Sequence, residues 1–119
     1  MNPALSASTL EMKQCVPCEG GVAKYSLEEA TAQVASLPAW RLTEDGTRIC
    51  RDWQLKNFRD GIRLINTIGA LAEREQHHPD LHLESSRKVR VEIYTHAIDG
   101  LSENDFILAA KIDAVSPPS

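Results

Sequence analysis

The fold is decided by the stretch Asn57–Gln76, NFRDGIRLINTIGALAEREQ, and by the shorter stretch Val89–Thr95, VRVEIYT, which follows it in the chain. In the longer stretch apolar residues recur at helical spacing for about five turns, and Pro79 ends the pattern. In the shorter stretch apolar and polar residues alternate, which is typical of a half-buried strand. The sequence therefore predicts a long amphipathic helix packed on a sheet. The main apolar stripe of that helix comprises Phe58, Ile62, Ile65, Ile68 or Gly69, and Ala72, and it is widened by Leu64, Ile68 and Leu71.

Two further helices are predicted, one on each side of this region. Ser26 is suited to cap the first helix, because Glu29 lies three residues later as a capping box requires, and Pro38 ends it. Ser102 is suited to cap the last helix, and Asp105 in its first turn favours the positive end of the helix dipole. Both helices are therefore predicted from their N-terminal residues as well as from apolar spacing.

Four strands are predicted in two hairpins. Trp40–Thr43 and Thr47–Trp53 flank the turn signal Asp45-Gly46, and Leu81–Ser85 precedes the strand Val89–Thr95. The order is helix, two strands, long helix, two strands, helix. This order predicts an α+β fold with two layers, a four-stranded antiparallel sheet with helices packed on one face. The other face of the sheet is expected to be free for solvent, a ligand or a partner.

The composition of the 119 residues, with 42% apolar and 25% charged, predicts one globular domain. We place this domain at residues 25–113, after an extended N-terminal arm (1–24) and before a tail (114–119). The longest apolar run, Phe106–Ala110, is far below the roughly 20 residues of a membrane span, and the start of the chain has no secretory h-region. A net charge of -4 without a basic block disfavours nucleic-acid and membrane partners. We expect a cytoplasmic protein.

The three cysteines, Cys15, Cys18 and Cys50, are too few and odd in number for a disulfide framework. Cys15-x-x-Cys18 followed by Gly20-Gly21 resembles half of a zinc knuckle. A structural zinc site needs four ligands, however, and only Cys50 remains to supply another. We interpret the pair as ordinary reduced cysteines, with redox or metal-binding roles as alternatives.

Chemistry-bearing residues gather at the end of the long helix, in Glu73-x-x-x-His77-His78-Pro79. The C-terminal end of a helix favours a cationic imidazole, and Pro79 biases His78 towards an extended backbone. Glu73 lies one turn before His77 on the same helix face, so we expect it to accept a hydrogen bond from His77 and orient that ring. The simpler alternative is an ordinary polar helix end.

A third histidine, His96, follows the last predicted strand, and we expect Asp105 to orient it from the first turn of the last helix. Imidazole is the side chain best matched to proton transfer near neutral pH. Three imidazoles with two carboxylates suit acid–base chemistry, and the sequence has no Gly-x-Ser-x-Gly or phosphate-binding loop. Three histidines also suit zinc, but adjacent histidines lack the i, i+4 spacing of a helical zinc pair, so we expect no metal. A surface histidine at a strand end is the simpler alternative for His96.

Together these residues resemble the pterin-4a-carbinolamine dehydratases over roughly residues 26–113. The resemblance rests on Glu73-x-x-x-His77-His78-Pro79, on His96 seventeen residues after Pro79, and on Gly100–Asp113, GLSENDFILAAKID. Leu37-Pro-Ala-Trp40, Trp53 and Phe58 fit the same pattern, while the Cys-x-x-Cys arm and Leu81-His-Leu-Glu resemble a bacterial and plastid branch.

The resemblance implies removal of water from a 4a-hydroxytetrahydropterin to give the quinonoid dihydropterin, with a pterin as substrate and no metal or organic cofactor. It also implies the same α+β fold and an assembly of two or four copies. By position, the acid–base and pterin-contacting groups are His77, His78 and His96, with Asp105 orienting His96 or contacting the pterin and Glu73 supporting the pair. Further residues implied to border the substrate are Gln76, Pro79, Thr95 and Ala97.

An alternative comes from relatives that use this fold without catalysis. Some serve as a dimerisation cofactor for a transcription factor, and others resemble assembly chaperones for RuBisCO, so a protein client is the second hypothesis. Independently of the resemblance, apolar surface left on the long helix and an unpaired edge strand predict a homodimer or homotetramer.

Overall fold

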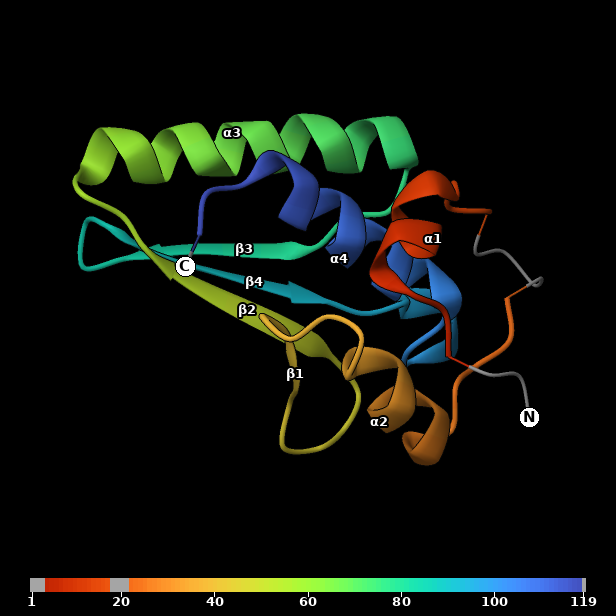
Figure 1. The fold of residues 1–119 in the computed structure, drawn as a ribbon. Helices are drawn as coiled ribbons and strands as arrows, with labels where there is room; N and C mark the ends of the chain where they lie inside the picture. The colour runs from red at the N-terminus through yellow and green to blue at the C-terminus, as the bar shows by residue number, and fades with distance from the viewer. Residues whose placement is uncertain (1–3, 18–21, 119) are drawn as a thin grey trace.

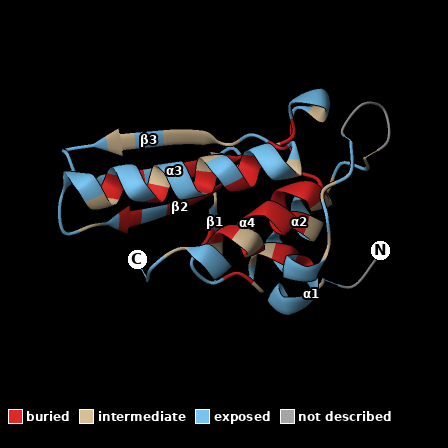
Figure 2. Ribbon diagram, turned by 90° about the horizontal axis from the view of Figure 1, so that it is seen from above, coloured by how far each residue is buried: buried red, intermediate tan, exposed pale blue. Residues whose placement is uncertain are grey.

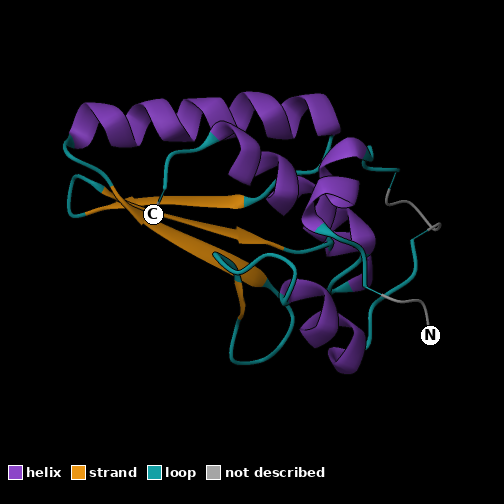
Figure 3. Cartoon of the chain, viewed as in Figure 1, coloured by secondary structure: helices purple, strands orange, loops and turns teal. Residues whose placement is uncertain are grey.

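The computed structural model describes residues 4–17 and 22–118, and it confirms the predicted α+β class (Figure 1). The elements in chain order are α1 (Ala7–Met12), α2 (Leu27–Val34), β1 (Arg41–Leu42), β2 (Ile49–Gln54), α3 (Phe58–Glu75), β3 (Asp80–Glu84), β4 (Lys88–Ile93), the 3₁₀ turn η1 (His96–Ile98) and α4 (Glu103–Val115). Figure 3 shows the strands forming one layer, below α3 and α4.

The sheet has the strand order β1-β2-β4-β3, and all of its pairings are antiparallel. The two hairpins therefore join through their second strands, β2 and β4, where Trp53 lies opposite Val89. The predicted Asp45-Gly46 turn closes the first hairpin, with Gly46 in the left-handed region at φ 73°. Because β1 and β3 are the outer strands, the edge of β3 stays open within the described residues.

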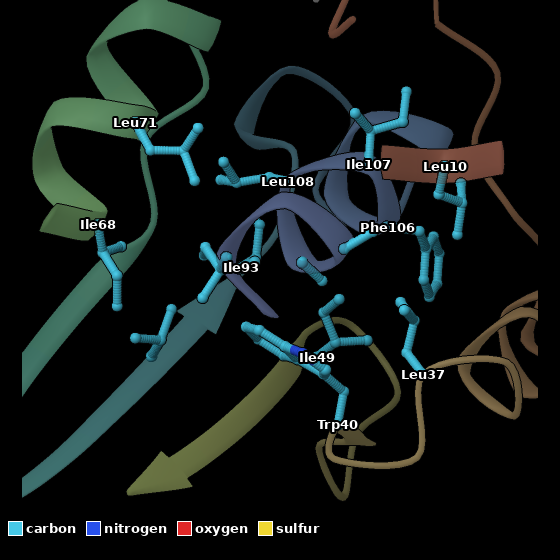
Figure 4. Packing of buried hydrophobic residues seen from close by; sticks show 14 of the residues in the cluster. Leu10, Leu37, Trp40, Ile49, Ile68, Leu71, Ile93, Phe106, Ile107 and Leu108 are labelled. Carbon is cyan, nitrogen blue, oxygen red and sulfur yellow. The ribbon is translucent and has the colours of Figure 1, made fainter. Parts of the chain in front are cut away.

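The core lies between the sheet and the helices, and α4 runs through its centre. Alternate residues of β2 and β4 face the helices, including Ile49, Trp53, Val91 and Ile93. From α4, Phe106, Ile107 and Leu108 join the same cluster, as Figure 4 shows. The residues of α4 from Asn104 to Ala110 are all buried, and Figure 2 shows the burial along this helix. The N-terminal residues of α4 are therefore fixed inside the protein, which matters for the site below.

The helix α3 presents a different apolar stripe to the core from the main stripe that we predicted. Its buried residues are Gly61, Leu64, Ile68, Leu71 and Ala72. Phe58 and Ile62, predicted as members of the main stripe, are 56% and 37% exposed. The helix carries two adjacent apolar stripes, and its spacing alone does not say which one packs on the sheet. The prediction was wrong for Phe58 and Ile62.

The N-terminal region is not an extended arm over its whole length. Ala7–Met12 form α1, with the Ser6 hydroxyl accepting a hydrogen bond from the Thr9 N–H at 3.2 Å. Leu10 of this helix is fully buried in the core cluster, and α1 packs on α4. The prediction of an extended arm was therefore wrong for this part. Cys18, the second cysteine of the Cys15-x-x-Cys18 motif, lies outside the described residues.

The uncovered face of the sheet is charged. Asp52 of β2 lies between Arg41 and Arg90, at 2.9 Å and 2.8 Å. Burial raises the pKa of Asp52, but hydrogen bonds from Arg90 and Arg41 outweigh it and leave the pKa below its usual value. Exposed pairs of this kind contribute little stability each, so their main effect is to keep this face polar.

Candidate active site

The end of α3 decides where His77 lies. The helix stops at Glu75 because Gln76 adopts the left-handed conformation at φ 53°, and the His77 N–H then bonds the Ala72 carbonyl at 3.2 Å. The chain turns inward after this cap, so the His77 side chain is buried. The Gln76 side chain donates back to the Glu73 carbonyl at 2.6 Å, which holds the turn closed.

The buried His77 ring meets Asp105, a fully buried residue in the first turn of α4. His77 Nε2 lies 2.6 Å from Asp105 Oδ1. The other carboxylate oxygen, Oδ2, accepts hydrogen bonds from the Thr95 hydroxyl and the Ser102 backbone N–H, both at 2.8 Å. Because Oδ2 already has two donors, an ionised Asp105 accepts from His77, which assigns the Nε2 proton to His77. We call this pair the His77–Asp105 dyad.

Thr95 and Ser102 support the dyad from a second layer of hydrogen bonds. Their hydroxyl oxygens lie 2.8 Å apart, and both residues are fully buried. Thr95 donates to Asp105, so Ser102 donates to Thr95. The Thr95 N–H also bonds the Gly100 carbonyl at 2.8 Å and closes the loop that carries His96 and Ala97. Each donor and acceptor in this buried cluster thus has a partner, as burial of polar groups requires.

His78 lies outside the core and pairs with Glu73, the carboxylate that we predicted to orient His77. Its Nε2 is 2.8 Å from Glu73 Oε1, and the two side chains are 60% and 70% exposed. Glu73 was expected to orient His77, and that prediction was wrong. The left-handed residue Gln76 reverses the chain after α3, so His77 turns inward and His78 returns to the helix surface beside Glu73.

His96 lies in the exposed turn η1 and makes its ring contact with Tyr94. The two ring centroids are 4.2 Å apart with the planes tilted by 46°. The Arg48 guanidinium carbon lies 4.0 Å from the Tyr94 ring centroid, and Arg48 also pairs with Asp80 at 2.6 Å. This chain of contacts ties the turn carrying His96 to the start of β3, two residues after His78.

We predicted that Asp105 orients His96, and that prediction was wrong. His77, Thr95 and Ser102 occupy the carboxylate oxygens of Asp105 instead. Sequence reasoning also missed Ser102 as a member of the cluster, and Arg48 and Tyr94 as the support of His96. Ser102 carried a signal as the predicted cap, whereas Arg48 and Tyr94 meet only through strand pairing across the sheet.

The arrangement resembles one that moves protons: a buried imidazole fixed by a carboxylate, with two exposed imidazoles on neighbouring segments. Comparison with known proteins identifies the family. The family model described as Pterin 4 alpha carbinolamine dehydratase matches residues 23–115. The chain belongs to this family.

Two relatives of this pterin-4-alpha-carbinolamine dehydratase family cover most of the chain. A Halorhodospira halophila protein named for this dehydratase is 44% identical over 107 residues, which is 90% of this chain and 97% of that protein. The mitochondrial pterin-4-alpha-carbinolamine dehydratase 2 of Arabidopsis thaliana is 41% identical over 111 residues, covering 91% of this chain and 59% of that protein. The cytoplasmic location of the present chain stays a prediction.

Two solved structures share the fold. One is described as a transcriptional coactivator/pterin dehydratase from Brucella melitensis, with a TM-score of 0.73, 23% identity and coverage of 80% of this chain and all of that one. The other is described as a pterin dehydratase-like RuBisCO assembly factor of the alpha-carboxysome, with a TM-score of 0.55 and 20% identity, covering 68% of this chain and 93% of that one. At these identities the likeness concerns the fold alone.

In this family member, residues 4–17 and 22–118 contain no group of three or more His, Cys, Asp and Glu side chains placed to hold a metal ion. That the protein works without metal or organic cofactor stays a prediction. Over the same described ranges, none of the helices combines the length and apolar character needed to span a membrane.

Proposed function

We propose that the protein dehydrates a 4a-hydroxytetrahydropterin to the quinonoid dihydropterin by histidine acid–base catalysis. The observation that carries the proposal is the buried His77–Asp105 dyad, with 2.6 Å between Nε2 and Oδ1, in a chain that belongs to the dehydratase family. A carboxylate-held imidazole has one tautomer and one orientation, which is the requirement for directed proton transfer.

The reaction needs two proton movements and no electron carrier. One group takes the proton from the ring nitrogen next to C4a as a C=N bond forms. Another group gives a proton to the departing hydroxyl as the C4a–O bond breaks, and water leaves. The protons balance because the enzyme accepts one and donates one, so two imidazoles in opposite protonation states are sufficient.

We assign these roles from burial and contacts. His77, held by Asp105 through Nε2, is assigned as one proton-transfer group, while His78 and His96, whose rings are exposed, supply the second group and contact the substrate. Glu73 orients His78. Bordering positions are assigned to Gln76, Pro79 and Ala97, whereas Thr95 is fully buried and supports Asp105.

The test is a dehydration assay on chemically prepared carbinolamine, following product absorbance above the spontaneous rate. His78→Ala and His96→Ala are each expected to lower turnover by about 10²–10⁴, the usual size of a general acid–base contribution. The matched control is His82→Ala, because His82 is the remaining histidine and lies exposed on the uncovered sheet face. A wild-type protein without activity, or losses below threefold for both variants, contradicts the proposal.

A non-catalytic role with a protein client is the second hypothesis. The RuBisCO assembly factor shares the fold with this chain at 20% identity, which supports no client here. An inactive wild type in the dehydration assay is the result that favours this hypothesis over the first.

We further propose that the protein forms a homo-oligomer through the outer stripe of α3, defined as Phe58, Ile62, Ile65 and Gly69. A Cβ added at Gly69 would meet no atom within 4 Å, so the C-terminal half of the stripe is open. In an antiparallel two-fold contact, Phe58 and Ile62 of one copy meet the part of the stripe around Gly69 in the other copy. Sedimentation should give at least a dimer, with Ile62→Glu shifting it towards monomer. A monomeric wild type at micromolar concentration contradicts this.

A further inference from the structure

The N-terminal segment, residues 4–17, lies outside the span matched by the family model, yet buried side chains of the family domain bind it. Gln33 of α2 accepts from the Leu5 N–H at 2.9 Å and donates to the Leu5 carbonyl at 2.8 Å. Asn104 of α4 accepts from the Val16 N–H at 3.0 Å and donates to the Val16 carbonyl at 2.7 Å. Each buried amide therefore pairs with both backbone groups of one residue, as a neighbouring strand does.

The second of these two attachments lies where the dyad is assembled. The Cys15 N–H donates to Glu75 Oε1 at 3.0 Å, and its thiol donates to the Asn104 carbonyl at 3.5 Å. Glu75 is the last residue of α3, two positions before His77, and Asn104 immediately precedes Asp105. Cys15 and Val16 thus connect the two helix ends that supply the two halves of the dyad.

The surrounding charges agree with a fixed junction. Lys111 of α4 lies 3.8 Å from the Glu75 carboxylate and donates to the Glu11 carbonyl at 2.9 Å. Burial, followed by the negative charge of Glu75, raises the pKa of Cys15 to about 12. The thiol is therefore a neutral donor at physiological pH, and it adds no negative charge beside Asp105. The Glu75 side chain is only 13% exposed at this junction.

We infer that Cys15 and Val16 are positioning residues for the reaction: through Glu75 and Asn104 they hold the end of α3 and the start of α4 at the separation at which His77 and Asp105 bond. The inference rests on the proposed function for its kinetic consequence. A small displacement of catalytic groups is enough to lower turnover strongly while leaving the fold intact.

The experiment compares the two attachments of the segment in the full-length protein. Glu75→Ala removes the acceptor for Cys15, Glu75→Gln keeps an oxygen acceptor at the same place, and Gln33→Leu removes two hydrogen bonds at the distant attachment. We expect Glu75→Ala to lower kcat by about 10- to 100-fold with KM within about twofold. Glu75→Gln should restore kcat to within about threefold, and Gln33→Leu should lower the melting temperature while leaving kcat within about twofold.

A second measurement does not depend on turnover. The ¹H–¹⁵N imidazole signals of His77 report its Nε2–H bond to Asp105, and they should broaden or shift in Glu75→Ala but not in Gln33→Leu. If the wild type has no dehydratase activity, this spectrum still tests the positioning role, so the two proposals fail separately. If Glu75→Ala does not fold, Asn104→Leu gives the same comparison. The inference is overturned if Glu75→Ala and Gln33→Leu lower kcat equally, or if the His77 signal is unchanged in Glu75→Ala.

Discussion

Replacing Asp105 by Asn tests the reasoning about the dyad most directly. The carboxylate accepts three hydrogen bonds, from His77, Thr95 and the Ser102 N–H. An amide has one oxygen, which has to face Thr95 and Ser102 because both of them donate there. The NH₂ group then faces His77 Nε2, so Nε2 becomes an acceptor and the ring proton moves to Nδ1. The substitution therefore keeps the shape of the site and reverses the tautomer of His77.

The expected magnitudes follow from these three bonds. Hydrogen bonds to a charged group contribute about 1.5–3 kcal/mol each and neutral ones about 0.5–1.5, so making all three bonds neutral in Asp105→Asn should cost about 3–4 kcal/mol of stability. At roughly 4 °C per kcal/mol for a domain of this size, the protein stays folded at 25 °C. Turnover should fall about 10²-fold or more, because the reversed tautomer of His77 is not the one that Asp105 holds in place for proton transfer. Asp105→Ala leaves the three buried donors without an acceptor, at about 1–3 kcal/mol each, and should cost more, up to about 9 kcal/mol.

The assay combines turnover on the carbinolamine with the imidazole ¹⁵N spectrum of His77, which distinguishes the two tautomers. The matched control is Asp99→Asn, because Asp99 is exposed in the neighbouring loop with a left-handed backbone at φ 49° that Asn tolerates. Its stability should stay within about 0.5 kcal/mol of wild type. Turnover of Asp105→Asn within threefold of wild type, together with an unchanged tautomer, would refute the reasoning.

Three further predictions concern the rest of the molecule. Leu10→Ala should lower the free energy of unfolding by about 2–5 kcal/mol in urea, whereas Met12→Ala on the exposed side of the same helix should change it by less than about 0.5. With a pKa of about 12, only about one Cys15 thiol in 10⁴ is ionised at pH 8, so site-resolved mass spectrometry should find it alkylated far more slowly in the native than in the unfolded protein. The pKa of Asp52 is lowered in the folded protein, so its stabilising contribution is present above the ordinary pKa of about 3.9 and is lost as the pH falls through the lowered pKa. Asp52→Asn should therefore make the free energy of unfolding depend less steeply on pH in this acidic range. An unchanged pH dependence in the variant argues against the ion pairs.

The fold was predictable because its signals are local. The Ser26–Glu29 capping box forms as predicted, with bonds of 2.9 and 3.1 Å in the two directions. The Asp45-Gly46 turn sets the first hairpin, and the alternation of Val89–Thr95 places Val91 and Ile93 on the core face. Each of these patterns needs only a few neighbouring residues and an apolar face to bury.

The N-terminal helix α1 was missed for the opposite reason. It has six residues, too few to show apolar periodicity, and Leu10 is its one buried residue. Isolated helices of this length are not stable in water, so α1 depends on packing against α4 and on attachments such as that of Leu5 to Gln33. No local pattern predicts a helix that tertiary contacts create.

The candidate residues of the site were found by type, but their partners were not. Spacing on an ideal helix assigns Glu73 to His77, and that reasoning fails because Gln76 leaves the helix in a left-handed conformation. Asn and Gly are the usual residues at that position, so Gln76 gave no warning. The partner of Asp105 depends on how the end of α3 meets the start of α4, which is a property of the packed structure.

Asp105 shows why the fold and the site cannot be separated at this junction. Its carboxylate accepts the Ser102 N–H at the start of α4, which is a capping interaction, and the same carboxylate holds His77. A cap ordinarily contributes about 1 kcal/mol and lies at the surface, whereas this one is fully buried and orients an imidazole. Because Ser102 and Thr95 already fix Oδ2, the position of Oδ1 is set before any ligand arrives. The fold thus pre-organises the dyad, and substitutions at Asp105 should affect stability and turnover together, while those at His78 and His96, which are exposed, should affect turnover alone.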